Sequence, residues 1–418
     1  VHDNDVPIEE TTAPLPDPIA AGAITNVADG GNVFNNTLTI NAWQRNMHLT
    51  AYGGYTIGNG NVTNNTLLFT GSTKLIGSDK DHHFYGGYAG GTGNAIGNKV
   101  TLRGIEGRFT AYGGYAVQGD ATNNEVTVDG EHLLTTAGEN YKYANVYGGY
   151  SEQGNATNNT VLVHNVHPTQ SDFDNKHLLH LHGGKAGVGK DGTTGNTLKV
   201  KGYGNAVGDI SNFEKLHFIL EPTQLGTGSY SSDRMFYIYD YNGHNVPKFD
   251  WNNITAEGAA AWLNAQQSSG RELPSLTLFQ MRQYPFGHEQ TSNALIHTNY
   301  KPKLLGVSAD GNYEVGCRVT PDRPSLNAAF NSYYIYLTTH RFRGVDKTIS
   351  ADGDHVGGTS YYGSEVSQNT VTVTGGKHKE IWGGRVDGIK GSANHNTVVH
   401  RAGTTERIRG GLTYSIEA

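Results

Sequence analysis

The amino-acid sequence predicts an all-β protein: a right-handed parallel β-helix (solenoid) with a central inserted subdomain that is either α+β or built of irregular coils. Three observations predict this fold. One short phrase recurs along the chain, its first six copies each lead into a short asparagine-led strand, and glycine is unusually frequent. We divide the chain into an extended N-terminal lead-in at residues 1–22, β-helix repeats at 23–211, the central insertion at 212–347, and resumed repeats at 348–418.

The recurring phrase is the tetrapeptide Y-G-G-Y, followed after a glycine-rich turn by an asparagine tag. Complete copies begin at Tyr52, Tyr85, Tyr112 and Tyr147, and degenerate copies begin at His182, Trp382 and Arg409. Successive copies are 33, 27, 35 and 35 residues apart, and the last two are 27 apart. A period that tolerates insertions is typical of a solenoid whose loops lengthen on one side, whereas a closed barrel or sandwich does not repeat one local sequence in this way.

Each element of the phrase has a physical reason to recur. Paired glycines supply positive φ or let neighbouring backbones approach closely, and asparagines tolerate left-handed backbone, so stacked copies can form a ladder along the axis. The tag opens a short alternating strand, as at residues 160–163 and 370–373. The aromatics would lie on opposite sides of the turn and stack on their equivalents one coil away, which favours packing over ligand binding. We therefore assign a structural role to Gly53, Gly54, Gly86, Gly87, Gly113, Gly114, Gly148, Gly149, Asn65, Asn124 and Asn159.

Composition narrows the class of protein. The 418 residues exceed one ordinary core, so they form two or three domains or one elongated array, and 57 glycines with only 17% charged residues favour turns and strands over helices. The net charge is −7 and the sequence has no basic block, so it offers no electrostatic attraction to the phosphates of a nucleic acid. Cys317 is the only cysteine, which excludes an internal disulfide framework and favours a buried, inert thiol. The sequence has no run of 18 or more apolar residues, so it predicts no membrane-spanning helix.

The central insertion lacks the repeat and is rich in proline. We expect a helix at residues 255–267, with Thr255 as a candidate N-cap, and strands at residues 235–241, 275–281 and 333–338. Insertions on a rigid scaffold often carry function. The candidate recognition residues are therefore Tyr237, Tyr239 and Tyr241, which share one face of a strand, together with Trp251; a core strand of the subdomain is the alternative interpretation.

Three groups of acidic and histidine residues are candidates for a catalytic or metal site. Asp79 and Asp81 lie beside two histidines, and Asp352 and Asp354 lie beside His355, but both groups fall in turns where solvated side chains are the ordinary expectation. His180 and His182 alternate on one strand near His177, and a surface cluster is favoured over a metal site. Serine-nucleophile, calcium-repeat and phosphate-loop motifs are absent from the sequence. We predict no catalytic residues, no metal site and no cofactor.

The residues from Tyr147 to Val161, which read Y-G-G-Y through G-N-A-T-N-N-T-V, resemble the repeats of autotransporter (type V secreted) passenger domains of anaerobic Gram-negative bacteria. The segment at residues 208–216 is similar to one that follows such repeats, and the resemblance covers about residues 23–220 and 346–418. It implies a β-helical passenger exported through the outer membrane and attached there by a C-terminal β-barrel that this sequence lacks. We expect the natural chain to continue beyond Ala418, because no capping unit is visible there.

The sequence therefore predicts an extracellular, cell-surface adhesin or auto-aggregation factor rather than an enzyme. Its expected partners are a host-cell or bacterial surface protein or glycan, and self-association between like rods is equally compatible. A carbohydrate-active enzyme, either a polysaccharide lyase or a glycoside hydrolase on the same fold, is the alternative. Two carboxylates facing each other across a groove would favour the enzyme, and a smooth aromatic and polar face would favour the adhesin.

Overall fold

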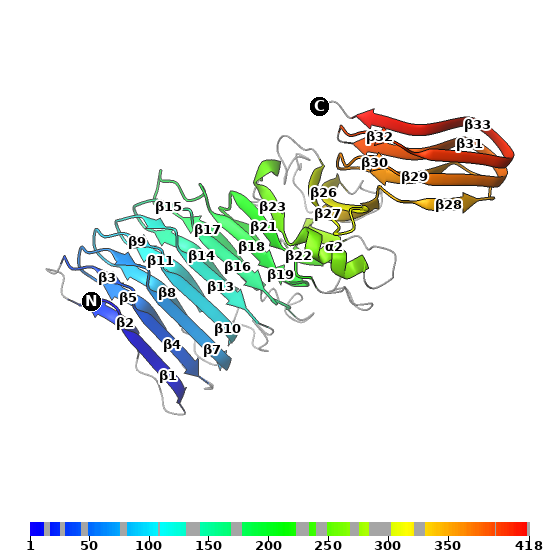
Figure 1. The fold of residues 1–418 in the computed structure, drawn as a ribbon. Helices are drawn as coiled ribbons and strands as arrows, with labels where there is room; N and C mark the ends of the chain where they lie inside the picture. The colour runs from blue at the N-terminus through cyan, green and yellow to red at the C-terminus, as the bar shows by residue number, and fades with distance from the viewer. Residues whose placement is uncertain are drawn as a thin grey trace.

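The predicted all-β solenoid is confirmed. The computed structural model describes residues 1–11, 17–25, 30–42, 49–75, 82–107, 109–130, 143–168, 178–222, 234–239, 249–267, 276–283, 302–321, 331–388 and 390–415. In the part of the chain that the structure describes, the residues are 64% strand and 4% helix, and the parallel sheets stack as a solenoid of about 9 turns. The coils follow one another from the N-terminus toward the centre of the molecule, and a second stack lies at the C-terminal end (Figure 1).

Within the described residues, each N-terminal coil adds one strand to each of three sheets. The first sheet is ordered β1 (Asp5–Thr11), β4 (Thr37–Ala42), β7 (Thr66–Leu75), β10 (Lys99–Gly107), β13 (Glu125–Asp129), β16 (Thr160–His164), β18 (Thr197–Lys201), β21 (Lys215–Ile219) and β23 (Ile254–Glu257). The second is ordered β2 (Ile19–Ile24), β5 (Thr50–Thr56), β8 (His82–Ala89), β11 (Phe109–Ala116), β14 (Tyr143–Ser151), β17 (Leu178–Lys185) and β20 (Asp209–Ser211). The third, of two-residue strands, contains β3 (Val33–Phe34), β6 (Val62–Thr63), β9 (Ala95–Ile96), β12 (Ala121–Thr122) and β15 (Ala156–Thr157).

The register of these sheets follows the repeat. In the first sheet Val126 pairs with Val100 on one side and with Val161 on the other, so equivalent residues form columns along the axis. Alternate residues of each strand point inward, and all three valines are buried. Fully burying such a side chain contributes roughly 1.5–3 kcal/mol, and the columns repeat this gain at every coil. The hydrophobic core is therefore a continuous column inside the solenoid.

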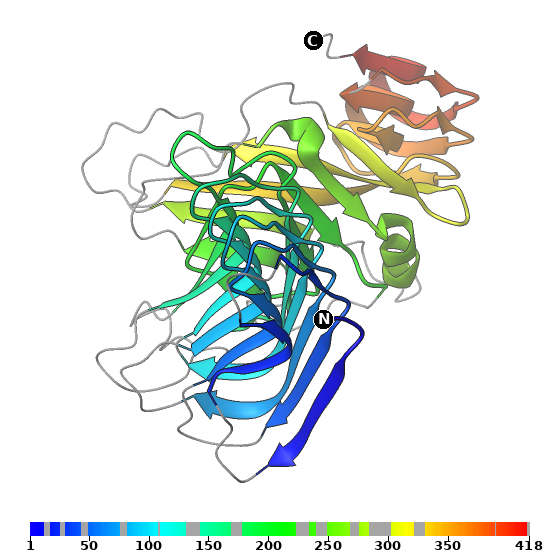
Figure 2. The same ribbon diagram turned by 90° about the vertical axis from the view of Figure 1, so that its left-hand side faces the viewer.

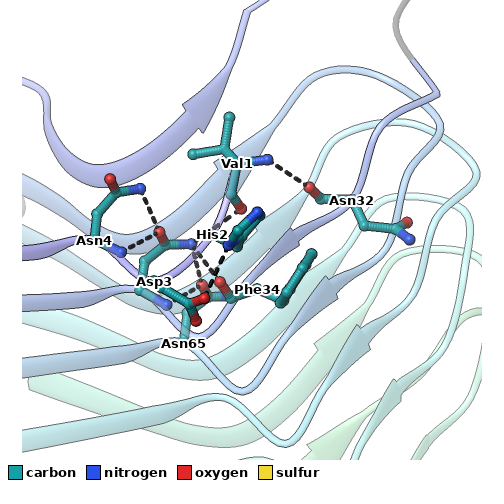
Figure 3. Close-up of polar contacts among 8 residues, drawn as sticks. Val1, His2, Asp3, Asn4, Asn32, Phe34 and Asn65 are labelled. Carbon is teal, nitrogen blue, oxygen red and sulfur yellow. Dashed lines mark hydrogen bonds and ion pairs between the residues drawn. The ribbon is translucent and has the colours of Figure 1, made fainter.

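The N-terminal segment differs from the extended lead-in that the sequence predicts. Strand β1 pairs in parallel with β4, and β2 pairs with β5, so both belong to the first coil. The Val1 ammonium donates to the Asn32 carbonyl at 3.0 Å, and the His2 ring stacks on Phe34 at 4.8 Å (Figure 3). Isolated acids and prolines indicated an unpaired segment, but pairing with the next coil outweighs that local preference.

The central region continues the coils without the repeat motif. Strands β21 and β23 extend the first sheet, and a further sheet begins in parallel with β19 (Asn205–Val207), β22 (Arg234–Tyr239) and β24 (Leu276–Gln283). It then turns antiparallel through β27 (Asn331–Arg341), β26 (Tyr313–Pro321) and the edge strand β25 (Lys303–Val307). The boundary expected at residue 211 is therefore a change of sequence pattern within continuing coils.

The expected helix begins later than the sequence predicts. A 3₁₀ turn, η1 (Trp251–Asn253), leads into β23, where Thr255 lies, and α2 covers Ala259–Gln267. Gly258 has φ +79 and its carbonyl accepts from the Trp262 amide, so it marks the start of the helix. The strands expected in this region are found, displaced by a few residues at their ends.

The C-terminal stack contains β28 (Asp346–Ile349), β29 (His355–Ser360), β30 (Val366–Ser367), β31 (Thr370–Gly388), β32 (Ala393–Asn394) and β33 (Thr397–Ser415). In both views it lies beyond the antiparallel sheet of the central region (Figures 1 and 2). Glu314 of β26 joins the two parts. Its buried carboxylate accepts from the Ser360 hydroxyl at 2.9 Å and from the amides of Tyr361 and Tyr362 at 2.6 and 3.3 Å.

Candidate functional site

The feature of the surface that stands out is a double column of tyrosines on the second sheet, here called the tyrosine face. The first column stacks Tyr52, Tyr85, Tyr112 and Tyr147, and the second stacks Tyr55, Tyr88, Tyr115 and Tyr150. Ring centroids in a column are 4.7–5.4 Å apart, with interplanar angles from 4° to 26°. All eight side chains are partly exposed. Ring stacking between coils, as the sequence predicts, is confirmed.

The two columns touch each other instead of lying on opposite sides of a turn. The two rings of one coil meet edge to face in three coils, as between Tyr85 and Tyr88 at 5.5 Å and 89°, and they are tilted at 53° between Tyr52 and Tyr55. The cause is the glycine pair between them. Both glycines are buried, and the tyrosines on either side of the pair are both partly exposed on the outer side of the sheet. Stacking along the axis covers the ring faces, so edges and hydroxyl groups form the outer surface, and each hydroxyl can donate and accept.

The glycine pairs are needed for close approach and not for positive φ, which none of the eight has. A Cβ on Gly113 would lie 2.4 Å from the Gly148 carbonyl oxygen, one coil away. A Cβ on Gly114 would lie 2.4 Å from Oδ1 of Asn124. Both distances are shorter than any ordinary carbon contact, so only glycine fits behind the tyrosines, and the structural assignment of the glycine pairs has a steric basis.

Behind the glycines runs the predicted asparagine ladder. Asn65 donates through Nδ2 to Oδ1 of Asn98 at 3.0 Å, Asn98 donates to Asn124 at 3.1 Å, and Asn124 donates to Asn159 at 3.1 Å. Backbone amides of the same residues donate to the same oxygens at 2.9–3.0 Å. The residue before each ladder asparagine supplies the left-handed backbone, with φ of 54°, 58° and 57° at Asn64, Asn123 and Asn158. The two asparagines of a tag thus have different roles.

A second ladder, which the sequence analysis missed, follows the glycine-rich turn. The side-chain oxygens of Asn32, Asn61, Asn94, Asp120 and Asn155 accept from the backbone amide of the next coil's equivalent, at 2.7–3.0 Å. Here the acceptor belongs to the earlier coil, whereas in the inner ladder it belongs to the later coil. The recurring Asn or Asp three residues before each tag was the available signal.

Charged groups lie near both ends of the tyrosine face: the carboxylate of Asp17 acts on Tyr52 at one end, and Glu152 and Lys185 lie at the other. The Tyr115 hydroxyl donates to Oε1 of Glu152, and Lys185 lies 4.9 Å from the centroid of the Tyr150 ring. Burial, the hydrogen bond to Glu152 and its negative charge raise the pKa of Tyr115 well above its usual value. Burial and neighbouring phenols likewise raise the pKa of Tyr85. The face is therefore uncharged over its tyrosines at neutral pH.

His182 continues the first column, 4.4 Å from the Tyr147 ring. Its Nδ1 lies 2.6 Å from the Ser211 hydroxyl, and His180 is 3.1 Å from Asp209. Burial, reinforced by His180 and Lys185, lowers the pKa of His182, so its ring is neutral at pH 7. The two histidines thus contact different polar groups, and His177 lies outside the described residues.

The residues predicted to bind are placed apart from this face. Tyr237 is partly exposed on β22, with the Arg234 guanidinium 5.0 Å from its ring. The backbone of Tyr239 pairs with Arg282, and Tyr241 lies outside the described residues. Trp251 is 1% exposed, and Lys303 covers its ring at 5.1 Å, so Trp251 belongs to the core and offers no surface to a partner.

The acids considered for catalysis have structural partners where they are described. Asp352 accepts from the Lys377 amide at 2.7 Å, and Asp354 accepts from the amides of Lys379 and Glu380 at 3.2 and 2.8 Å. Asp79 and Asp81 lie outside the described residues. Throughout the part of the chain that the structure describes, no three His, Cys, Asp or Glu side chains are arranged to hold a metal ion.

Cys317 lies on β26, is 2% exposed, and burial raises the pKa of its thiol to about 12, which fits the inert thiol that the sequence predicts. Among the described residues, no helix is long and apolar enough to cross a bilayer. No family model, curated protein or solved structure matches this chain.

Proposed function

We propose that this protein is an extracellular, cell-surface adhesin or auto-aggregation factor, and that the tyrosine face is its contact surface. The observation that carries the proposal is the pair of continuous, partly exposed tyrosine columns, which cross four coils of a rigid scaffold. Tyrosine is enriched at protein interfaces because it offers a large amphipathic contact with few rotatable bonds. The resemblance of the repeats to autotransporter passengers supports the location on a bacterial surface.

The geometry of the rings favours some partners over others. Because the ring faces are covered by stacking, the surface offers edges and hydroxyl groups to a partner. This suits hydrogen bonding to a protein backbone or to glycan hydroxyls more than stacking of a sugar ring on an aromatic face. The carboxylates of Asp352 and Asp354 accept backbone hydrogen bonds, which supports a structural role for them. They therefore do not support the alternative function, a carbohydrate-active enzyme.

The test compares variants of the full chain in glycan-array, host-cell and bacterial-aggregation assays, beside a polysaccharide depolymerisation assay. Tyr88→Ser with Tyr115→Ser removes two rings from the face. The matched control, Leu68→Ser with Leu162→Ser, changes two partly buried outward side chains on the first sheet. Central aromatic contacts often contribute about 2 kcal/mol or more, so we expect at least a tenfold loss of binding in the tyrosine variant only. Equal losses in both variants, or depolymerisation by the unmodified chain, would overturn the proposal.

A further inference from the structure

We propose that the tyrosine face is also a site of one-electron oxidation, at which an oxidising equivalent entering any ring of the two columns settles on Tyr115 as a neutral phenoxyl radical. This goes beyond the adhesive function and does not depend on it. The inference rests on the ring contacts within the face and on the carboxylate beside one of its phenols.

The contacts of Tyr115 place it within a continuous aromatic array. Its ring stacks on Tyr88 at 5.0 Å and on Tyr150 at 4.7 Å, with interplanar angles of 13° and 4°. It meets Tyr112 and Tyr85 edge to face at 5.2 and 5.7 Å. Rings in van der Waals contact exchange electrons readily, so an electron removed from any of these tyrosines can be replaced from its neighbour. The position of lowest energy then decides where the oxidation remains.

Glu152 makes Tyr115 that position. The Tyr115 hydroxyl donates to Oε1 of Glu152, so a proton acceptor is already in place. A phenol that has lost an electron is a strong acid, and a base that already accepts its hydrogen bond can take the proton directly. The same burial and charge that raise the pKa of Tyr115 keep the phenol protonated at neutral pH, so the proton has to leave together with the electron.

A one-electron oxidant of the peroxide-derived or photogenerated class takes one electron from the array. The O–H bond of Tyr115 breaks, an O–H bond forms on the Glu152 carboxylate, and the products are the Tyr115 phenoxyl radical, a neutral Glu152 and the reduced oxidant. A thiol or another one-electron reductant reverses the step, since the electron returns to the ring and Glu152 returns its proton to the phenol oxygen.

The experiment oxidises the full chain by flash photolysis of ruthenium tris-bipyridyl with a cobalt(III) ammine as electron acceptor, in the presence of a nitroso spin trap, and maps the adducts by peptide mass spectrometry. Tyr414 on β33 serves as the internal standard because it is 53% exposed and lies outside the tyrosine face. If accessibility alone governed the labelling, Tyr414 would be labelled ahead of the partly buried rings. We expect several-fold more adduct on Tyr115 than on Tyr414.

The variant Glu152→Gln keeps the shape and a hydrogen-bond acceptor but removes the base. We expect the adduct on Tyr115 to fall about fivefold or more, to the level of its neighbours in the column, with unchanged circular dichroism. The matched control is Glu125→Gln, which makes the same substitution on the first sheet and should leave the distribution unchanged. Labelling led by Tyr414 in the unmodified chain would overturn the proposal. A lead of Tyr115 that survives Glu152→Gln would overturn it equally.

Discussion

Replacing Asn124 by alanine removes one rung of the inner ladder, and the structure sets the size of the effect. The Asn124 side chain is 1% exposed. Its Oδ1 accepts from the backbone amide and from Nδ2 of Asn98 at 2.9 and 3.1 Å, and its Nδ2 donates to the Ala95 carbonyl and to Oδ1 of Asn159 at 2.9 and 3.1 Å. The truncation therefore deprives two buried backbone groups of these partners, the Asn98 amide and the Ala95 carbonyl.

Each buried polar group left without a partner costs roughly 1–3 kcal/mol, so we expect Asn124→Ala to lower the free energy of unfolding by about 4 kcal/mol. The matched control is the adjacent Asn123→Gly. Asn123 is exposed and has φ +58, which glycine adopts easily, so this change should stay within about 0.5 kcal/mol.

Urea unfolding followed by far-ultraviolet circular dichroism measures both variants, and amide hydrogen exchange at Asn98 reports on the rung directly. We expect the Asn98 amide to lose most of its protection in Asn124→Ala and to keep it in Asn123→Gly. An alanine variant that unfolds within about 1 kcal/mol of the parent, with the Asn98 amide still protected, would refute the view that this ladder holds adjacent coils together.

Three further predictions concern other parts of the chain. Gly114→Ala forces a Cβ to within 2.4 Å of the ladder oxygen and should destabilise by about 3 kcal/mol, whereas Gly30→Ala, whose Cβ meets no atom within 4 Å, should be neutral in thermal unfolding. Glu314→Ala leaves buried donors of residues 360–362 without their acceptor, so hydrogen exchange there should rise while the N-terminal coils stay protected. His378 has Nδ1 and Nε2 at 2.7 and 2.8 Å from the carbonyls of residues 353 and 375, which favours the doubly protonated ring and raises its pKa. Protonated His378 therefore stabilises the folded chain. This contribution is complete below pH about 6.5 and is lost as the pH rises through the higher pKa of the folded state. His378→Gln should abolish the corresponding part of the pH dependence of the melting temperature, and an unchanged profile would contradict it.

The repetitive part of the fold could be predicted because each coil repeats the residues that determine its structure. The spacing of Tyr52, Tyr85 and Tyr112 gave the coil length, and the alternating residues after each tag gave the inward columns. Stacking of the tyrosines and a ladder of asparagines followed from the chemistry of residues repeated at one position. These contacts depend only on an equivalent residue one coil away, which the sequence itself supplies.

The remaining features depend on contacts that the repeat does not encode. The sequence allows two reasons for the glycine pairs, and the structure shows that close approach applies, because none of the eight has a positive φ and Asn124 lies directly behind Gly114. Thr255 looked like a helix cap, but pairing of its strand with β21 takes it into the first sheet. Trp251 looked like an anchor for a partner, but it packs under Lys303 in the core. The tyrosine face exists because both columns lie on one side of the second sheet, which the sequence repeat alone does not determine.

The central claim is that successive copies of the repeat are adjacent layers of one coil, and site-directed cross-linking tests it most directly. In a Cys317→Ser background, Thr127→Cys is combined either with Leu162→Cys, its register partner in the next layer, or with Leu68→Cys, two layers away in the same column. Adjacent strands are roughly 4.8 Å apart, and the second pair is about twice as far. A short bifunctional thiol reagent should join the introduced thiols of the first pair nearly quantitatively and leave those of the second pair unlinked. Efficient linkage of the second pair, or none of the first, would contradict the layered coil.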